Sequence, residues 1–412
     1  MNKETSDAIN AAAAAIAPDL IAFAQRLVQT PSPPGAEGEV ATLVEGEMRR
    51  LGFDAVWRDT AGNVIGRLGG GAGGGSLMLN GHMDHVDPGP AQAWPYPPFA
   101  GVIADGRLHG RGSADMKGAL AAQVYAVAVL LRAGLRPAGD VIVTAVVQEE
   151  TGGLGTQCLL EEGLRADAAI VGEASGLELK RGHRGRLEVL VTVNGRSVHA
   201  SAPERAANPH FTIAAFIQRL RSLPLPGDPD FRGASVAPTL IVSDQTAGNV
   251  TPGRLVLHLD YRTLPEETAA AVVASLQPLL DASLSDGCTG QVSIERATMR
   301  TYTGLERNVL NAFPPFRLPA DHALVRRAGK ALAELTGKTP PVGFWRFSTD
   351  GGHLVQEAGI PVLGYGPGEE TMVHTVGESV ALEQLQGAAA GYAALCLALT
   401  EPLSTSQPAT AM

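Results

Sequence analysis

Three apolar segments of this chain each end in a histidine or an acidic residue, and this recurring arrangement constrains the fold more than any other feature. Residues 76–84, 140–150 and 168–174 read SLMLNGHMD, DVIVTAVVQEE and AAIVGEA. Near-continuous apolar strands of this kind are typical of parallel sheets whose two faces are both covered by helices. Ionisable residues that follow such strands predict a polar site built on the sheet.

Helical and strand patterns alternate through the first part of the chain and again near its end. Apolar residues recur at helical spacing in residues 19–29, 40–52, 116–134, 321–337 and 382–399. Further strands are predicted at residues 53–59, 63–69, 341–348 and 360–367. The alternation predicts an α/β domain with a mostly parallel sheet that helices cover on both faces.

The pattern changes after Lys180. Strands at 185–197, 235–244, 254–265 and 290–298 and helices at 208–223 and 266–284 follow in the order strand–helix–strand–strand–helix–strand. This order is that of the ferredoxin-like unit. We therefore predict an inserted α+β domain at residues 182–300, with residues 1–181 and 301–412 forming the larger domain.

Residues 69–76, GGGAGGGS, lie between two predicted strands. A phosphate-binding loop would continue with Lys-Ser/Thr and open a helix. This segment does neither, so the pattern favours a flexible hairpin connection.

Length, charge and cysteine usage restrict the function classes. A chain of 412 residues is long for one hydrophobic core. Its net charge of -10 argues against nucleic acid or an anionic membrane as a partner. Cys158, Cys288 and Cys396 lie far apart in the sequence. We therefore expect buried structural thiols in a protein from a reducing compartment. The N-terminus lacks signal-peptide organisation, and the longest apolar run is too short to span a bilayer, so we expect a cytoplasmic protein.

Two of the ionisable positions have a simpler alternative. His82 and Asp84 share one face of an extended strand, and a carboxylate often accepts the second ring N–H of a metal-binding histidine. The alternative is an ordinary surface pair. Asp115 precedes a long helix, where a helix N-cap is the simpler interpretation, although its carboxylate could instead bridge two cations.

Glu149 and Glu150 follow an apolar run without a positive neighbour. Burying two adjacent carboxylates is unfavourable unless they share a cation or a proton. Consecutive side chains point to opposite sides, so one can bind a metal while the other acts as a general base. A solvated loop is the alternative. Glu173 repeats the pattern of a strand followed by a carboxylate, and His374 supplies a second imidazole.

These oxygen and nitrogen donors suit zinc, manganese or cobalt better than calcium. Two metals sharing Asp115 would polarise a carbonyl group and activate a water. Six other histidines lack this context and are expected to be structural or at the surface: His85, His109, His210, His258, His322 and His353.

Over essentially its whole length the chain resembles the co-catalytic zinc metallopeptidase family of acetylornithine deacetylase, succinyl-diaminopimelate desuccinylase, aminoacylase-1 and carboxypeptidase G. GHMDHVDPG, GRGSADMKG, QEETGGLGT and VGEAS resemble four ordered motifs of that family. Asp87-Pro88-Gly89 departs from the usual Val-Pro-x-Gly. The segments GHRGR and GPGEE resemble a less characterised hydrolase branch, so the substrate does not transfer from the well-known members.

The resemblance implies two Zn2+ ions, with Mn2+ or Co2+ as alternatives. It implies a cis peptide bond between Asp115 and Met116, Glu149 as the general base, and Asp84 as the residue that orients His82. The implied ligands are His82, Asp115 and Glu173 for one ion, and Asp115, Glu150 and His374 for the other.

The inserted segment resembles the family's lid or dimerisation domain, which implies a homodimer. His199 in NGRSVHAS would then reach the active site of the partner subunit and stabilise the oxyanion. Asn249 would contact the tetrahedral oxygen, Arg262 the substrate carboxylate, and Gly352 the substrate pocket.

Together these features predict a hydrolase of the amide bond of N-acyl amino acids or small peptides, in which a metal-bridging hydroxide attacks after Glu149 has taken its proton. One alternative is an aminopeptidase of the related fold without a lid, acting on free-amine peptides. The other is a metal-dependent binding protein without activity, which would have no need of an additional free carboxylate at Glu149.

Overall fold

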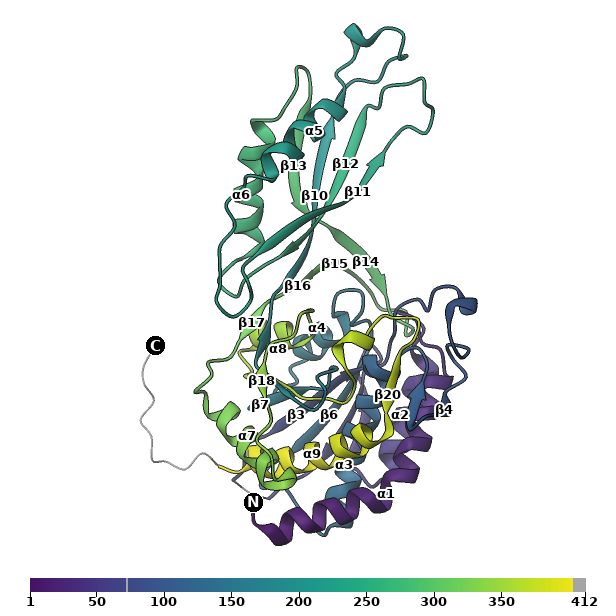
Figure 1. Ribbon diagram of the computed structural model, residues 1–412, viewed down its shortest axis with the longest axis vertical. Helices are drawn as coiled ribbons and strands as arrows, with labels where there is room; N and C mark the ends of the chain where they lie inside the picture. The colour runs from purple at the N-terminus through teal and green to yellow at the C-terminus, as the bar shows by residue number, and fades with distance from the viewer. Residues whose placement is uncertain (72, 403–412) are drawn as a thin grey trace.

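The computed structural model describes residues 1–71 and 73–402. The chain forms a larger unit around an eight-stranded sheet and a smaller, elongated unit that projects from it (Figure 1). The chain leaves the larger unit after His183 and returns near Phe313, so the smaller unit is an insertion.

The sheet of the larger unit is mixed but parallel at its centre, which confirms the predicted α/β class. Its strand order is β1-β2-β6-β3-β7-β19-β8-β18, and the four central strands β6, β3, β7 and β19 run parallel. The strands are β1 (Ala55–Arg58), β2 (Val64–Leu68), β3 (Leu77–His82), β6 (Val141–Val146), β7 (Ala168–Val171), β8 (Leu179–Lys180), β18 (Val342–Gly343) and β19 (Val362–Gly364). Strands β4 (Val102–Ala104), β5 (Arg107–His109) and β20 (Ser379–Ala381) form a separate small sheet, and β9 (Gly182–His183) pairs with β17 (Phe316–Arg317).

Helices cover both faces of this sheet, because consecutive strand residues point to opposite sides. Val141 and Val143 of β6 join the core beneath one layer of helices, whereas Ile142 and Val146 face the other layer. The first layer comprises α1 (Lys3–Gln29), α2 (Gly38–Arg50), α3 (Gly118–Arg132), α7 (Ala323–Thr336) and α9 (Leu382–Thr400). The second comprises α4 (Leu154–Glu161) and α8 (Gly351–Ala358).

The smaller unit contains an antiparallel sheet with the order β11-β12-β10-β13. Its two helices pack against the buried face of that sheet and form a core of their own. The elements are β10 (Arg186–Asn194), α5 (Pro209–Leu220), β11 (Ser235–Ser243), β12 (Arg254–Arg262), α6 (Ala269–Asp281) and β13 (Thr289–Ile294). Their order along the chain is the ferredoxin-like one.

The chain does not pass from the smaller unit to the larger one at a single point, as the predicted boundary at residue 300 implied. Strands β14 (Arg296–Arg300) and β15 (Glu306–Leu310) form a hairpin, and β16 (Ala312–Phe313) pairs again with β10. The hairpin tip packs on the larger unit, where the Tyr302 hydroxyl donates to the Gly62 carbonyl at 2.8 Å. The hairpin therefore belongs to both units.

The prediction of a hairpin at the glycine run was wrong. Strand β2 pairs with β6 instead of β3, so this connection passes over the end of β6. A Cβ at Gly70 would lie 2.1 Å from the Gly139 carbonyl oxygen, and one at Gly74 would lie 2.2 Å from the Ala138 carbonyl carbon. Glycine is needed here because two backbone segments approach each other closely.

Two local expectations differ from the structure. The predicted strand at 341–348 shortens to β18, and α8 follows it without a clear apolar repeat in the sequence. Two helical segments, Lys3–Gln29 and Ser113–Arg132, are long and apolar enough to cross a membrane, contrary to expectation. The second is a core helix, with 89% of its most apolar window buried. The three cysteines are buried and free, as predicted, whereas the cytoplasmic location stays a prediction.

Candidate dinuclear metal site

The site lies where neighbouring parallel strands end. His82 is the last residue of β3, Glu149 and Glu150 follow β6, and Glu173 follows β7. Strand β3 lies between β6 and β7 and runs parallel to both, so all three carry their carboxyl ends to one edge of the sheet. Ligands of open α/β sheets bind at this edge.

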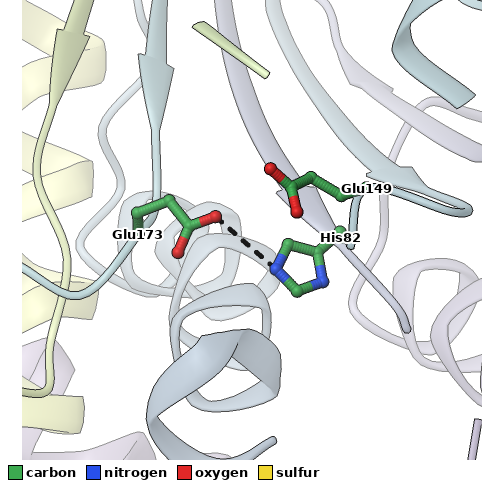
Figure 2. Close-up of side chains that lie close together, drawn as sticks. All are labelled: His82, Glu149 and Glu173. Carbon is green, nitrogen blue, oxygen red and sulfur yellow. Dashed lines mark ion pairs between the residues drawn. The ribbon is translucent and has the colours of Figure 1, made fainter. Parts of the chain in front are cut away.

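His82 is the centre of the buried half of the site. Its Nε2 atom lies 3.0 Å from Asp115 Oδ1 and 3.5 Å from Glu173 Oε1. Figure 2 shows the Glu173 carboxylate directed at the His82 ring, with the Glu149 carboxylate above the ring in this view. Ligand atoms of His82, Glu149 and Glu173 all lie within 4.8 Å of one another. The same is true of His82, Asp115 and Glu150.

His374 forms the second half of the site together with Asp115 and Glu150. Its Nε2 atom lies 3.0 Å from Asp115 Oδ2 and 3.1 Å from Glu150 Oε2. Asp115 thus contacts one histidine through each carboxylate oxygen. This is the arrangement that a carboxylate bridging two cations requires. His374 has a φ of 60°, which residues other than glycine rarely adopt.

Asp84 connects the two strand ends behind the site. Its Oδ1 lies 3.4 Å from His82 Nδ1, and its two oxygens accept hydrogen bonds from the backbone N–H groups of Glu149 and Glu150, each at 3.1 Å. The His82 Nδ1 also lies 3.1 Å from the Asp84 carbonyl oxygen. Asp84 is therefore buried in a position that fixes both the histidine and the loop of the two glutamates.

Glu378 and Arg111 hold Asp115 in place, and the sequence did not single them out. The Glu378 carboxylate accepts the backbone N–H groups of Ala114 and Asp115 at 2.9 and 3.1 Å and pairs with Arg111. The peptide bond between Asp115 and Met116 is cis, as the resemblance implied. The available signal was a carboxylate that opens the short apolar segment ESVAL only four residues after His374.

Several ionisable groups of the cluster have raised pKa values, as expected where buried acids need a nearby positive charge. Burial, and then the charge of Asp115, raise the pKa of Glu173 to about 8. Burial raises the pKa of Glu149 well above its ordinary value, and the charges of Asp350 and Glu173 add to this effect. Contacts with Asp115 and Glu150 raise the pKa of His374 to about 10.

The donor set fits two divalent cations. Buried carboxylates resist ionisation unless positive charge is near, and a bound cation would supply it. The Glu173 Oε2 atom is buried and lacks a hydrogen-bond partner within the described residues. Two imidazoles and several carboxylates are ligands typical of zinc sites.

The structure places His199 and Asn249 together but away from this cluster. The Ala200 N–H donates to the Asn249 carbonyl at 2.9 Å, and both predicted residues are exposed in loops at the far end of β10 and β12. Arg262 lies at the opposite end of β12, where it pairs with Asp260 at 2.6 Å. One chain does not bring these three residues together.

Gly352 is buried, and its predicted role in a substrate pocket stays a prediction. A Cβ at this position would lie 1.8 Å from the Pro314 carbonyl oxygen. The close backbone contact is a sufficient reason for glycine there.

Comparison with known proteins identifies a family and several relatives that this chain resembles. The family described as Peptidase family M20/M25/M40 matches residues 78–398. The chain is 31% identical over 386 residues to the uncharacterised protein YgeY of Escherichia coli strain K12, covering 92% of this chain and 94% of that protein. It is 31% identical over 388 residues to succinyl-diaminopimelate desuccinylase of Rhodospirillum centenum, covering 90% and 94%.

Solved structures show the same fold at lower sequence identity. The di-peptidase Dug1p of Saccharomyces cerevisiae has a TM-score of 0.75 at 15% identity, covering 98% of this chain and all of that one. The Bacillus subtilis YXEP protein, a dinuclear metal-binding peptidase, has a TM-score of 0.70 at 17% identity, covering 94% and 99%.

The chain belongs to peptidase family M20/M25/M40. It is a metallohydrolase of the class that acts on peptides or acylated amino acids.

Proposed function

We propose that this protein hydrolyses the amide bond of N-acyl amino acids or small peptides, with two zinc ions held by His82, Asp115, Glu150, Glu173 and His374. The observation that supports this most is the state of Glu149. Glu149 is 6% exposed and, among the described residues, no hydrogen bond or ion pair engages its carboxylate. A site that only binds metal has no need of such a group.

The bound metals would polarise the substrate carbonyl and lower the pKa of a bound water to about 7. Glu149 would take a proton from the attacking water and deliver it to the leaving nitrogen. Burial and the neighbouring carboxylates raise the pKa of Glu149, which suits a group that must both accept and donate a proton near neutral pH. Asp84 would fix the backbone on which Glu149 is mounted.

Replacing Glu149 tests this role. Glu149→Gln keeps the shape of the side chain but cannot carry the proton, so turnover should fall by about 10²–10⁴-fold. Metal content, measured by inductively coupled plasma mass spectrometry, should remain unchanged. Glu161→Gln, on the exposed end of α4, is the matched control and should retain full activity. Undiminished turnover in Glu149→Gln would remove this residue from the mechanism.

We also propose that the smaller unit pairs two chains into a homodimer and delivers His199 and Asn249 to the partner's site. Strand β12 runs from Arg254 to Arg262 and is about 26 Å long at about 3.3 Å per residue. Asn249 lies beyond its first residue, so the strand separates it from Arg262. In a homodimer, Asn249 of one chain and Arg262 of the other could contact the same substrate.

The apolar surface of the smaller unit supports this pairing. Leu240, Ile241 and Val242 of β11 are consecutive and about half exposed, and Phe211 of α5 is 70% exposed. Strand β11 is the edge of its sheet. An exposed apolar edge strand tends to pair with another chain.

Mixing two inactive variants tests the shared site. His199→Ala should depress activity, as should a variant that lacks the ligand His374. Hybrid dimers of the two would contain one site with both histidines intact, so refolding the mixture should restore up to about a quarter of the wild-type activity by random pairing. If the mixture stays inactive, each site is built from a single chain.

The inserted unit argues against the rival aminopeptidase without a lid. A substrate panel separates the two: N-acyl amino acids should be cleaved, and peptides with a free amine but a blocked carboxylate should not. The opposite preference would favour the aminopeptidase.

A further inference from the structure

We propose that the substrate carries an apolar group, up to the size of an aromatic ring, which binds in a proline-lined pocket beside Glu150. This inference rests on the proposed hydrolytic function and specifies its substrate class. The pocket has a volume of about 460 Å³. Its apolar lining consists of Pro31, Pro33, Pro34, Val86, Pro88 and Phe99.

The pocket adjoins the metal site at Glu150. Glu150 and Thr151 form part of its lining, and the Glu150 carboxylate contacts His374 at 3.1 Å. A substrate whose scissile bond lies at the cluster can therefore extend directly into this cavity.

Buried hydrogen bonds fix the first wall, the loop between α1 and α2. The Ser32 hydroxyl donates to the Met83 carbonyl at 2.6 Å, and the Lys117 ammonium donates to the Thr30 carbonyl at 2.7 Å. Each proline has a restricted φ and lacks an N–H. The loop thus presents apolar rings on a rigid backbone, although Pro31 and Pro33 are themselves exposed.

The second wall, which follows β3, is equally well supported. The Trp94 indole donates to the Pro88 carbonyl at 2.8 Å, and the ring centres of Phe99 and His85 are 5.1 Å apart. Two rigid walls form a preformed cavity, which is typical of small-molecule sites.

The charge of the lining favours an uncharged group. His85 Nε2 accepts the Ser32 N–H at 2.9 Å and its Nδ1 lies 2.8 Å from the Val86 carbonyl. Accepting at one nitrogen and donating at the other makes this imidazole neutral. The lining residues that carry charge are Asp87 and Glu150, both negative. A carboxylate such as that of a succinyl group would be repelled here.

The cavity on the other side of Glu150 is polar by contrast. Its volume is ≈ 440 Å³, it shares Pro34, Glu150 and Thr151 with the first, and it is lined by Arg186 and Arg300. The two cavities that share Glu150 therefore differ: the first has an apolar lining, and the second contains two arginines, of which Arg186 pairs with Glu188 and Asp260. A substrate with one apolar end and one carboxylate end matches this division.

The volume sets the size of the group. An apolar cavity of about 150 Å³ suffices to bind benzene. The proline-lined pocket is larger and adjoins the metal site at Glu150, so a benzoyl group or a phenylalanine side chain should fit, whereas an acetyl group would leave most of it unfilled.

A matched substrate panel tests the proposal. The metal-loaded enzyme should cleave N-benzoyl or phenylalanine-containing substrates with a kcat/KM at least about 10-fold above that for the succinyl or aspartate counterparts. Val86→Lys adds a cation to the pocket and should shift this ratio about 10-fold towards the acidic substrates. Val342→Lys, at an exposed valine of β18 outside the pocket, should leave the ratio unchanged.

A binding measurement separates this proposal from the proposed function. Calorimetry should show that N-benzoylglycine binds wild-type protein and binds Val86→Lys about 10-fold more weakly. Should Val86→Lys fail to fold, Val86→Phe fills the same cavity and should exclude the benzoyl group while still accepting acetyl.

The possible outcomes distinguish the proposed hydrolytic function from the proposed apolar pocket. Binding of the benzoyl probe without hydrolysis of any substrate would overturn the hydrolase and leave the pocket standing. Hydrolysis with a preference for acidic groups, or a ratio unaffected by both Val86 variants, would overturn the pocket.

Discussion

Several buried acids lie in or beside the cluster at the sheet edge, and the sequence indicated only some of them. Glu149, Glu150 and Glu173 were predictable because each follows an apolar strand. Glu37 and Glu378 were missed, because nothing next to Glu37 indicates burial and the only signal for Glu378 is the short apolar segment ESVAL that it opens. Their positions depend on contacts with residues far along the chain, such as the N–H of Gln148, which donates to Glu37 at 3.2 Å.

Glu37 should make stability depend on pH. Burial, and then the charge of Asp84, raise its pKa from 4.5 to about 7. The folded protein therefore binds more protons than the unfolded chain between these values, and stability falls as the pH rises through that window. Glu37→Gln imitates the protonated form and should remove this loss, which is on the order of 3 kcal/mol.

Thermal unfolding of metal-free protein at pH 5 and pH 8 measures the effect. Wild type should lose more stability between the two pH values than Glu37→Gln does. Glu39→Gln, on the exposed side of α2, should behave as wild type. Equal losses in wild type and Glu37→Gln would show that Glu37 ionises normally.

At the scale of elements, the sequence predicted the helices, the strands and the places where strands end. It did not predict which strands are neighbours in the sheet. The alternation of apolar strands and helices predicted the parallel centre of the sheet. The glycine run misled because a hairpin and a crossover have the same local composition. Only the pairing of β2 with β6 distinguishes them, and that pairing joins residues about 80 positions apart, such as Val64 and Ala145.

One buried side chain links these elements to the site. Asn63 precedes β2, and its Oδ1 accepts the Val147 N–H at 2.9 Å while its Nδ2 donates to the Gly155 carbonyl at 2.9 Å. It therefore holds both ends of the loop that carries Glu149.

Asn63→Ala should destabilise the protein by about 2–4 kcal/mol, because two buried backbone groups lose their partners. Turnover should also fall while metal is retained, since the loop loses its support. Chemical denaturation and steady-state kinetics check the two effects. Asn194→Ala, at the exposed end of β10, should change neither. Normal stability of Asn63→Ala would mean that the loop is held by other contacts.

At the scale of the molecule, the insertion was predictable from the change of pattern after Lys180, whereas the relation of its far end to the metal site was not. His199 was singled out through a resemblance, and the structure places it among exposed loops away from the cluster. Sequence patterns describe one chain, and the contact of His199 with a partner subunit stays a prediction.

The edge of the smaller unit gives a direct test of pairing. Ile241→Asp puts a charge on an apolar strand that we expect to be buried between subunits, so the dimer should dissociate. Sedimentation velocity should then report a particle of 42.7 kDa in place of one of twice that mass. Val342→Asp, on an exposed edge of the larger unit, should remain dimeric. A monomeric wild type would contradict the proposal outright.

The unequal exposure of the two histidines has a kinetic consequence. The His82 side chain is 1% exposed and that of His374 is 48% exposed. A chelator would reach the ion held by His374 first, so metal loss followed over time should show a fast and a slow phase of similar size, with turnover ending in the fast one. Loss in one phase would contradict this. A protein with such a site would respond to metal scarcity in steps, giving up one ion readily while the other keeps the sheet edge assembled.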